Sequence, residues 1–240
     1  MHSILAYTDG AALGNPGAGG WAALILTPTE VVELGDYDAY ATNNQMELLA
    51  IVRALEWLAS HKQHSASITL LSDSKYCVRG ASEWLPGWKK KGWITQKGEP
   101  VANRELWEEL DTFQAQFQKL EFCYVPGHQG VAGNERADDL ASSFAEGRSP
   151  ELYSGSRSDY FPWLGQSEEA FKKPKIETRS SSRSQAKAYY LSWVDGQLEK
   201  HASWSECQQR VNGRSGAKFK KVKSLEEEKE ILAKWGVATG

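Results

Sequence analysis

Apolar residues recur along the first 147 positions in two distinct patterns. Short apolar runs predict strands at residues 4–7, 21–26, 31–40, 68–71 and 120–125. Apolar residues at helical spacing predict helices at residues 43–58, 106–117 and 135–146. Three strands followed by alternating helices and strands are typical of a layered α/β domain.

The chain changes character after this domain. Serine, glycine, lysine, arginine and proline dominate residues 148–186, a composition that predicts a flexible linker. Residues 160–164 form an apolar island within this linker. The island either docks on a domain or forms a local cluster, and we favour docking.

A regular pattern returns at residue 187. It predicts strands at residues 189–193 and 217–222, and helices at residues 204–211 and 225–235. The dipeptide Asp195-Gly196 suits a hairpin turn. These elements predict a small α+β domain that is able to fold alone. The predicted organisation is therefore a first domain at 1–147, a linker at 148–186 and a second domain at 187–236.

The composition is that of an ordinary globular protein. Of its 240 residues, 40% are apolar and 25% are charged. No apolar run approaches the roughly 20 residues of a membrane helix, and the first residues do not resemble a signal peptide. Three cysteines without a Cys-x-x-Cys pair indicate reduced thiols, so we expect a cytoplasmic protein.

Charge is distributed unevenly along the chain. Residues 1–149 carry 12 Lys and Arg against 19 Asp and Glu, whereas residues 150–240 carry 16 against 12. Two interpretations remain open for the basic second part. It reflects either ordinary surface variation or an appended domain that binds a polyanion.

Four acidic residues stand in sequence contexts that suit the positioning of a carboxylate: Asp9, Glu47, Asp73 and Asp138. Asp9 and Asp73 directly follow predicted strands, where ligand sites form in open α/β sheets. Glu47 falls in the first turn of a helix for which Asn43 is a suitable N-cap. Carboxylate clusters hold hard cations such as Mg²⁺, and two such cations suit phosphodiester hydrolysis. The four residues therefore predict a metal-dependent nuclease.

Six motifs follow one another through the first domain. They are Tyr7-Thr8-Asp9-Gly10, Gly14-Asn15-Pro16-Gly17, Thr42-Asn43-Asn44-Gln45-Met46-Glu47-Leu48, Ser72-Asp73-Ser74, Pro126-Gly127-His128 and Asn134-Glu135-Arg136-Ala137-Asp138. In this order the first domain resembles type 1 ribonuclease H, which cuts the RNA strand of RNA–DNA hybrids. The resemblance implies a ribonuclease H-like five-stranded mixed sheet flanked by helices. It also implies two Mg²⁺ ions, with Mn²⁺ as a substitute, and products that end in 5′-phosphomonoesters.

The resemblance implies a role for each acidic residue. Asp9 would bridge both metals, and Asp138 would complete the site of the attacking water. Glu47 and Asp73 would complete the leaving-group site. His128 would assist proton transfer and product release, which suits imidazole chemistry at neutral pH.

The same resemblance implies contacts with the hybrid. Asn15 would lie near the RNA strand, Asn44 would read base edges, and Thr42 would grip a DNA phosphate. Lys75 stands where bacterial enzymes usually have Gln, so it would contact either a base or a phosphate. A basic protrusion would contact phosphates and sugars through Trp84, Trp88, Lys89, Lys90 and Lys91.

The second domain contains Trp204-Ser205-Glu206-Cys207, Val211-Asn212-Gly213 and Gly216-Ala217-Lys218-Phe219-Lys220-Lys221-Val222. These motifs resemble the hybrid-binding domain of eukaryotic type 1 ribonuclease H and of caulimovirus viroplasmin. In the eukaryotic enzymes this domain is N-terminal, whereas here it is C-terminal. The implied nucleic-acid contacts are Trp204, Lys218, Phe219, Lys220 and Lys221. The domain would bind RNA–DNA hybrid or RNA duplex, and a protein-interaction or structural module of the same fold remains the alternative.

We therefore expect a monomeric endonuclease that acts on RNA–DNA hybrids and has no membrane partner. One alternative is a catalytically silent hybrid-binding protein, which the presence of all four carboxylates disfavours. The other is an integrase-like DNA-cutting enzyme of the same broad fold. A comparison of hybrid cleavage with DNA duplex cleavage separates the expected hybrid endonuclease from the integrase-like enzyme.

Overall fold

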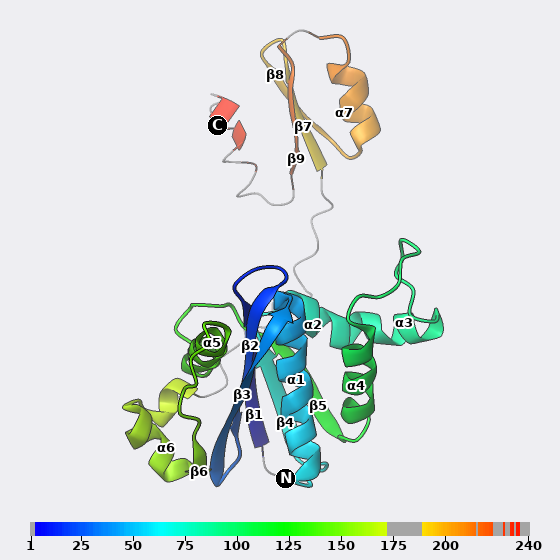
Figure 1. Ribbon diagram of the computed structural model, residues 1–240. Coiled ribbons are helices and arrows are strands. Elements are labelled where there is room, and N and C mark those ends of the chain that lie inside the picture. Colours follow the sequence, from blue (N-terminus) through cyan, green and yellow to red (C-terminus); the bar gives the residue numbers. More distant parts are fainter. Residues whose placement is uncertain are drawn as a thin grey trace. The chain divides into compact units, whose positions relative to one another are not determined.

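The computed structural model describes residues 3–171, 189–214 and 216–222, together with residues 228, 231, 232, 234 and 235. The chain divides into two compact units, Met1–Ile176 and Glu177–Gly240 (Figure 1). Among the described residues, no helix is long and apolar enough to cross a membrane.

A six-stranded mixed sheet forms the centre of the first unit, in the order β5-β4-β1-β2-β3-β6 (Figure 1). Its strands are β1 (Ser3–Ala12), β2 (Gly17–Leu26), β3 (Glu30–Ala41), β4 (Ser67–Ser72), β5 (Lys119–Tyr124) and β6 (Ser154–Ser156). Strand β4 is parallel to both β1 and β5, and the other neighbours are antiparallel. The helices are α1 (Asn43–Ser60), α2 (Lys75–Arg79), the π-helix η1 (Gly80–Trp84), α3 (Leu85–Lys90), α4 (Arg104–Gln114), α5 (Ala132–Ala145), α6 (Arg157–Leu164) and the 3₁₀ helix η2 (Glu168–Phe171).

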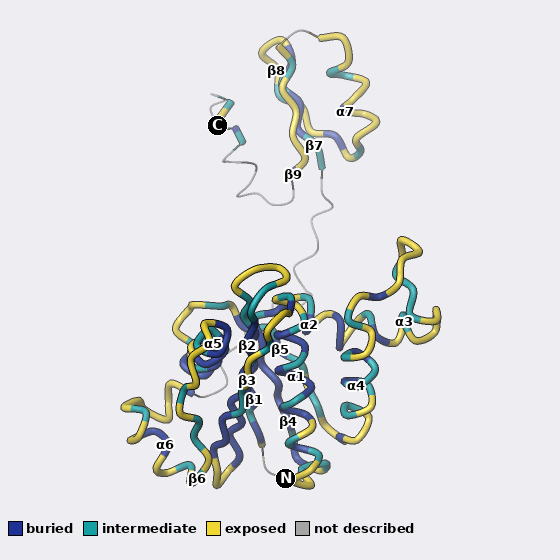
Figure 2. Tube along the Cα trace, in the orientation of Figure 1, coloured by how far each residue is buried: buried dark blue, intermediate teal, exposed yellow. Residues whose placement is uncertain are grey.

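Alternating side chains of the sheet belong to two different cores. Ile4 and Ala6 of β1 pack with α1 and α4, whereas Tyr7 packs with α5 and with Tyr160 and Phe161 of α6. Helices α1 and α4 therefore cover one face of the sheet, and α5 and α6 lie on the other (Figures 1 and 2). The predicted α/β class is confirmed, and the buried strands account for the short apolar runs of the sequence.

Asp9 lies inside β1 and not beyond its end, which corrects the sequence prediction. The strand continues to Ala12 because β2 pairs with it from Leu5 to Ala12, with Asp9 opposite Ala22. Polar residues in a strand weaken the apolar pattern without ending the hydrogen-bonded ladder. By contrast, β4 ends at Ser72, so Asp73 follows a strand as predicted.

Helix α1 begins with a capping box on Thr42, and not with Asn43 as its cap. The Thr42 hydroxyl accepts a hydrogen bond from the Gln45 nitrogen at 3.3 Å, and Gln45 Oε1 accepts one from the Thr42 nitrogen at 2.8 Å. Glu47 consequently falls in the second turn of α1, where it is buried against the sheet.

The structure also corrects the predicted linker and the five-stranded sheet. Ser154, Gly155 and Ser156 form the sixth strand, which pairs with β3 through backbone groups alone and carries no apolar pattern. Residues 149–171, here called the C-terminal extension, belong to the first unit, and the apolar island docks on that unit through α6. The rest of the predicted linker, residues 172–186, lies outside the described residues.

The second unit has a three-stranded antiparallel sheet in the order β8-β7-β9, with helix α7 packed beside it (Figure 1). Its elements are β7 (Tyr189–Val194), β8 (Gln197–His201), α7 (Trp204–Val211) and β9 (Lys218–Val222). Asp195 and Gly196 both have positive φ, as the predicted hairpin turn requires. The last predicted helix, residues 225–235, lies largely outside the described residues.

Candidate active site

Three carboxylates converge beside the parallel strands β1 and β4. The register pairs Thr8 with Ser72, so Asp9 and Asp73 follow at the same level. One oxygen from each of Asp9, Glu47 and Asp73 lies within 4.8 Å of the others. Asp138 of α5 shares a side-chain hydrogen bond with Asp9. The structure thus brings together all four acids that the sequence singled out.

Two glycines permit this close approach. A Cβ atom on Gly10 would lie 2.1 Å from the backbone nitrogen of Glu47, so a larger residue would push α1 away from β1. A Cβ atom on Gly127 would lie 2.4 Å from Oδ2 of Asp73. Both glycines occur in the predicted motifs, and their packing explains why those positions require glycine.

Burial and mutual repulsion weaken these acids. Burial, followed by the charge of Asp73, raises the pKa of Asp9 to about 8. Desolvation also raises the pKa of Glu47 well above its usual value, and it raises the pKa of Asp73. Full ionisation of the cluster is therefore costly unless a cation compensates the negative charge.

The donor set fits a divalent cation. Oε2 of Glu47 is buried and has no hydrogen-bonding partner among the described residues. Buried acceptors of this kind are costly, and carboxylate oxygens are the ligands that Mg²⁺ and Mn²⁺ prefer. A cation bound by these residues would satisfy that oxygen and relieve the repulsion between the acids.

Asn134 supports the cluster, although the sequence analysis gave this residue no role of its own. It is 2% exposed in the first turn of α5, and its side chain hydrogen-bonds to Asp73. This bond favours the ionised form of Asp73 and links α5 to the end of β4. The sequence did contain a signal for this role, because Asn134 is a polar residue at an inward position of an amphipathic helix.

His128 lies beside the cluster on the loop between β5 and α5. Its Nδ1 atom is 3.6 Å from Oδ2 of Asp138, and its side chain is 81% exposed. Its φ of +52° is uncommon for a residue other than glycine. The imidazole therefore combines contact with an acid of the cluster and open access to solvent.

The predicted RNA and DNA contacts gather around the N-termini of two helices. The Asn15 side chain accepts a hydrogen bond from the Asn43 nitrogen at 3.3 Å, which joins the Gly-rich turn to the start of α1. Thr42 caps this helix, and Asn44 is exposed in its first turn. Lys75 is exposed at the start of α2, with its ammonium 5.1 Å from the centroid of an aromatic ring of β5.

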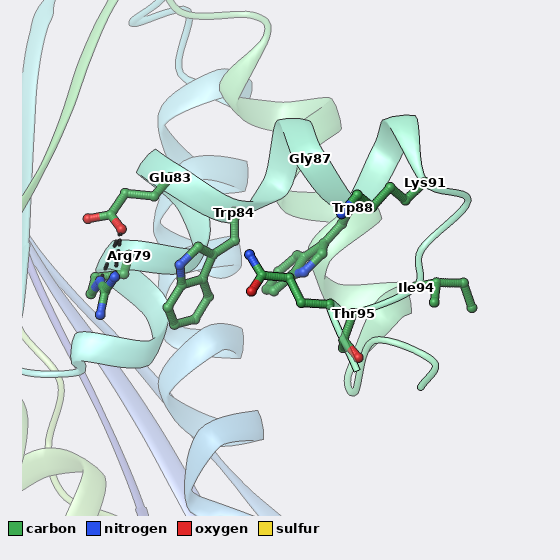
Figure 3. A pocket seen from close by; sticks show the side chains of 9 residues that line it. Arg79, Glu83, Trp84, Gly87, Trp88, Lys91, Ile94 and Thr95 are labelled. Atoms are coloured by element: carbon green, nitrogen blue, oxygen red, sulfur yellow. Dashed lines mark hydrogen bonds and ion pairs between the residues drawn. The ribbon is translucent and has the colours of Figure 1, made fainter. Parts of the chain in front are cut away.

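The basic protrusion is helical and carries a hollow that two of its indole rings line. Trp84 ends η1 and Trp88 lies on α3, and their ring centroids are 5.6 Å apart. Together with Arg79 and Lys91 they line a pocket of about 470 Å³ (Figure 3). The two indoles are half-buried, as predicted, and present ring surface beside positive charge.

The three lysines of the protrusion differ in what they contact. Lys89 forms an ion pair with Asp111 of α4 at 2.5 Å, which ties α3 to α4. Lys90 and Lys91 are exposed. We therefore expect Lys90 and Lys91 to contribute more than Lys89 to phosphate contacts.

The second unit carries an exposed aromatic cluster. Trp204 of α7 and Phe219 of β9 have ring centroids 5.2 Å apart and are 39% and 50% exposed. Tyr190 packs against Trp204. The lysines of β9 are all exposed: Lys218, Lys220 and Lys221. Phe219 and Lys221 therefore share one face of β9 with Trp204 and Tyr190, whereas Lys218 and Lys220 point to the other face of the strand.

Comparison with protein families accounts for both units. Residues 1–146, more than half of the chain, match the family described as RNase H. The chain belongs to the RNase H family. The first unit is accordingly a nuclease domain of the ribonuclease H type. Residues 201–230 match a second family, described as Ribonuclease H1 N-terminal domain, which confirms the resemblance predicted for the second unit.

Similar proteins support membership in the RNase H family. Ribonuclease H of Cyanothece sp. is 48% identical over 149 residues, which cover 61% of this chain and 91% of that protein. Ribonuclease HI of Pseudomonas aeruginosa is 48% identical over 139 residues, which cover 58% of this chain and 90% of that protein.

Solved structures support the fold. LC9-RNase H1, a type 1 RNase H with the type 2 active-site motif, aligns with a TM-score of 0.57 at 26% identity and covers 67% of this chain and 81% of its own. The N-terminal RNase H domain of Rv2228c from Mycobacterium tuberculosis aligns with a TM-score of 0.50 at 23% identity. That alignment covers 61% of this chain and 96% of that one, and it bears on the fold alone.

Proposed function

We propose that the protein hydrolyses the RNA strand of RNA–DNA hybrids at the cluster of Asp9, Glu47, Asp73 and Asp138. The observation that carries this proposal is the unsatisfied, buried oxygen of Glu47 beside converging carboxylates in an RNase H fold. Two Mg²⁺ ions, or Mn²⁺ in their place, would activate a water molecule and stabilise the leaving oxygen, which yields a 5′-phosphomonoester.

The protein's own groups would hold the cations and move protons. Asp9, whose Oδ1 accepts a hydrogen bond from the Gly10 nitrogen at 2.8 Å, lies centrally enough to serve both cations. Glu47 and Asp73 would complete one cation site, and Asp138 the other. His128 would exchange a proton with the reacting groups and with solvent, since it is both exposed and adjacent to Asp138.

The surfaces around the cluster suit two different strands. Asn15 and Asn44 offer neutral donors and acceptors for 2′-hydroxyls and base edges next to the carboxylates. The pocket that Trp84, Trp88 and Lys91 line suits a sugar and its phosphate on the other strand. This asymmetry favours a hybrid over a DNA duplex as the substrate.

A cleavage assay tests the proposal directly. Labelled RNA–DNA hybrid, single-stranded RNA, RNA duplex and DNA duplex would be incubated with the protein in Mg²⁺ and in EDTA. We expect cleavage of the hybrid alone, on its RNA strand and only with the cation. Cleavage of DNA duplex would support an integrase-like enzyme instead, and hybrid binding without cleavage would support a silent binding protein.

His128→Ala is expected to slow hybrid turnover by about 10²-fold or less, because the cations carry most of the chemistry. Hybrid binding should be unchanged, since the imidazole lies outside the surfaces that would grip the strands. Single-turnover and steady-state rates, compared with those of His61→Ala at the far end of α1, measure the effect. A loss as complete as that from removing Asp9, or no loss at all, would contradict the assigned role.

We further propose that the second unit binds RNA–DNA hybrid or RNA duplex through Trp204, Phe219 and the lysines of β9. Residues 177–240 form a compact unit, so this fragment should bind either duplex, with an affinity that falls steeply as salt increases. A fragment with Trp204→Ala and Phe219→Ala should bind at least several-fold more weakly, because ring surface for stacking is lost.

Comparison of residues 1–176 with the full chain measures what the second unit adds to catalysis. The full chain should bind long hybrids more tightly and cut them more processively, because a linked second site raises the local substrate concentration. Equal affinity and processivity across low and moderate salt would instead favour a protein-interaction or structural role for the second unit.

A further inference from the structure

A buried ion pair lies in the first unit outside the carboxylate cluster. Glu33 of β3 has a fully buried side chain, and both of its oxygens accept hydrogen bonds. Arg136 of α5 donates two, from Nε at 2.7 Å and from Nη2 at 2.9 Å. The Tyr160 hydroxyl donates a third at 2.7 Å, and the Tyr153 nitrogen a fourth at 3.0 Å. Glu33 therefore connects β3, α5 and the C-terminal extension.

The extension is also attached to β1 and to the turn between β2 and β3. The Arg157 guanidinium donates to the Thr27 carbonyl at 2.6 Å, and Tyr7 of β1 donates its hydroxyl to the Phe171 carbonyl at 3.2 Å. The Tyr7 ring lies directly under α5, because a Cβ atom on Gly133 would come within 2.4 Å of it. The extension thus contacts α5 through Arg136. It also supports Tyr7, on which the first turn of α5 rests.

One side of helix α5 contacts Glu33, and another side contributes to the carboxylate cluster. Arg136 lies two residues before Asp138 and two after Asn134, and positions two apart in a helix point about 200° from one another. Arg136 therefore faces Glu33, while Asn134 and Asp138 face the carboxylate cluster. A rotation of α5 about its axis that moved Asp138 would also move Arg136 and so disturb its two-pronged bond to Glu33.

We propose that Glu33, Arg136 and Tyr160 form a positioning cluster that sets the rotation of α5 and so places Asp138 and Asn134 for cation binding. The inference rests on the proposed function of the carboxylate cluster. It assigns a role to the C-terminal extension, whose residues lie beyond the 1–146 segment that matches the RNase H family.

Energetics favour positioning over simple stabilisation. A buried ion pair stabilises a fold no more than apolar side chains of similar size, because desolvation offsets the attraction. Its distinctive property is geometric, since four directed hydrogen bonds to one carboxylate admit only a narrow range of orientations. The Trp163 ring, 5.6 Å from the Arg136 guanidinium, restricts this side chain further.

Two tyrosines of the extension provide a matched test in the full chain. Tyr160→Phe removes the hydroxyl that donates to Glu33 and keeps the ring. Tyr153→Phe removes a hydroxyl that donates only to the Ser156 carbonyl of the same segment, at 2.7 Å. Mn²⁺ binding would be measured by calorimetry, and the dependence of thermal unfolding on Mg²⁺ by circular dichroism.

We expect Tyr160→Phe to weaken Mn²⁺ binding about three- to tenfold, below the loss of about 10–100-fold seen when a direct neighbour of a metal ligand is removed. The Mg²⁺ concentration for half-maximal hybrid cleavage should rise by the same factor, with an unchanged KM for hybrid. Tyr153→Phe should match the unsubstituted protein. If Tyr160→Phe fails to fold, Arg136→Lys, which keeps the charge but loses the two-pronged bond, should show the same shift.

The inference is overturned if Tyr160→Phe, or Arg136→Lys in its place, lowers the metal-free unfolding temperature but leaves cation affinity unchanged. Equal effects of both tyrosine substitutions on cation affinity would overturn it as well. Failure of the proposed function gives a different result, since the protein would then bind Mn²⁺ with the Tyr160 dependence and not cut hybrid.

Discussion

Asp9→Asn is expected to abolish cleavage of RNA–DNA hybrid and, without metal, to stabilise the fold. Cleavage should fall to background because, in the proposed mechanism, Asp9 serves both cations and no other described side chain can replace it. Stability should rise because desolvation of the buried carboxyl, followed by the charges of Asp73 and Asp138, raises the pKa of Asp9 to about 8. The amide has no charge to desolvate, so the substitution removes a cost that the folded enzyme accepts for cation binding.

The pH dependence gives this prediction a clear sign. A carboxyl whose pKa is raised on folding stabilises the fold fully at low pH, and this contribution is lost as pH rises through its folded pKa of about 8. In EDTA, the unfolding temperature of Asp9→Asn should therefore match that of the unsubstituted protein near pH 4. At pH 8 the unfolding temperature of Asp9→Asn should exceed that of the unsubstituted protein by roughly 5 °C or more. Saturating Mg²⁺ should narrow the difference.

Asp139→Asn is the matched control, since Asp139 is the exposed neighbour of Asp138 on α5. This variant should keep both activity and the pH dependence of stability. For both variants and the unsubstituted protein, thermal unfolding would be measured in EDTA and in Mg²⁺, and hybrid cleavage on the same samples. Near-native turnover of Asp9→Asn in Mg²⁺ would show that the metal assignment is wrong.

The carboxylate cluster was accessible from the sequence because local rules decide its parts. An apolar run that stops at Ser72-Asp73 predicts a strand end, and the parallel pairing of β4 with β1 then brings Asp9 alongside. The predicted end of the strand before Asp9 and the predicted N-cap at Asn43 were wrong for the same reason. The extent of β1 depends on its partner β2, and the cap of α1 depends on a reciprocal bond between Thr42 and Gln45, so neither follows from hydrophobicity alone.

The C-terminal extension was misassigned because the contacts that attach it to the rest of the first unit are long-range. Its strand is three residues of serine and glycine, and its place in the sheet is fixed by β3. Glu33 interrupts an apolar strand as an exposed position would. Its charged partner Arg136, 103 residues later, and two tyrosines of the extension make burial of this carboxylate tolerable. A single sequence contains no signal that joins Glu33 to Arg136.

Truncation after Arg148 is expected to unfold the first unit or to lower its unfolding temperature by more than about 10 °C, whereas truncation after Ile176 should leave it intact. The shorter form matches the end of the RNase H family segment but lacks Tyr160, Phe161 and Phe171, all buried in the core beneath β1 and α5. Loss of one buried aromatic ring typically costs about 3–5 kcal/mol. Three such losses approach the whole stability of a domain, about 5–15 kcal/mol.

Electrostatics worsen this loss in the shorter form. Without the extension, the buried carboxylate of Glu33 keeps Arg136 but loses the donors from Tyr153 and Tyr160. Water would then reach an ion pair whose orientation, in our proposal, sets α5 and Asp138. Any residual folded protein should therefore require more Mg²⁺ for hybrid cleavage than residues 1–176 do. Circular dichroism of both forms with and without Mg²⁺, beside the cleavage assay, measures each effect. Equal unfolding temperatures and equal Mg²⁺ requirements would show that the extension is dispensable and that the RNase H unit ends before it.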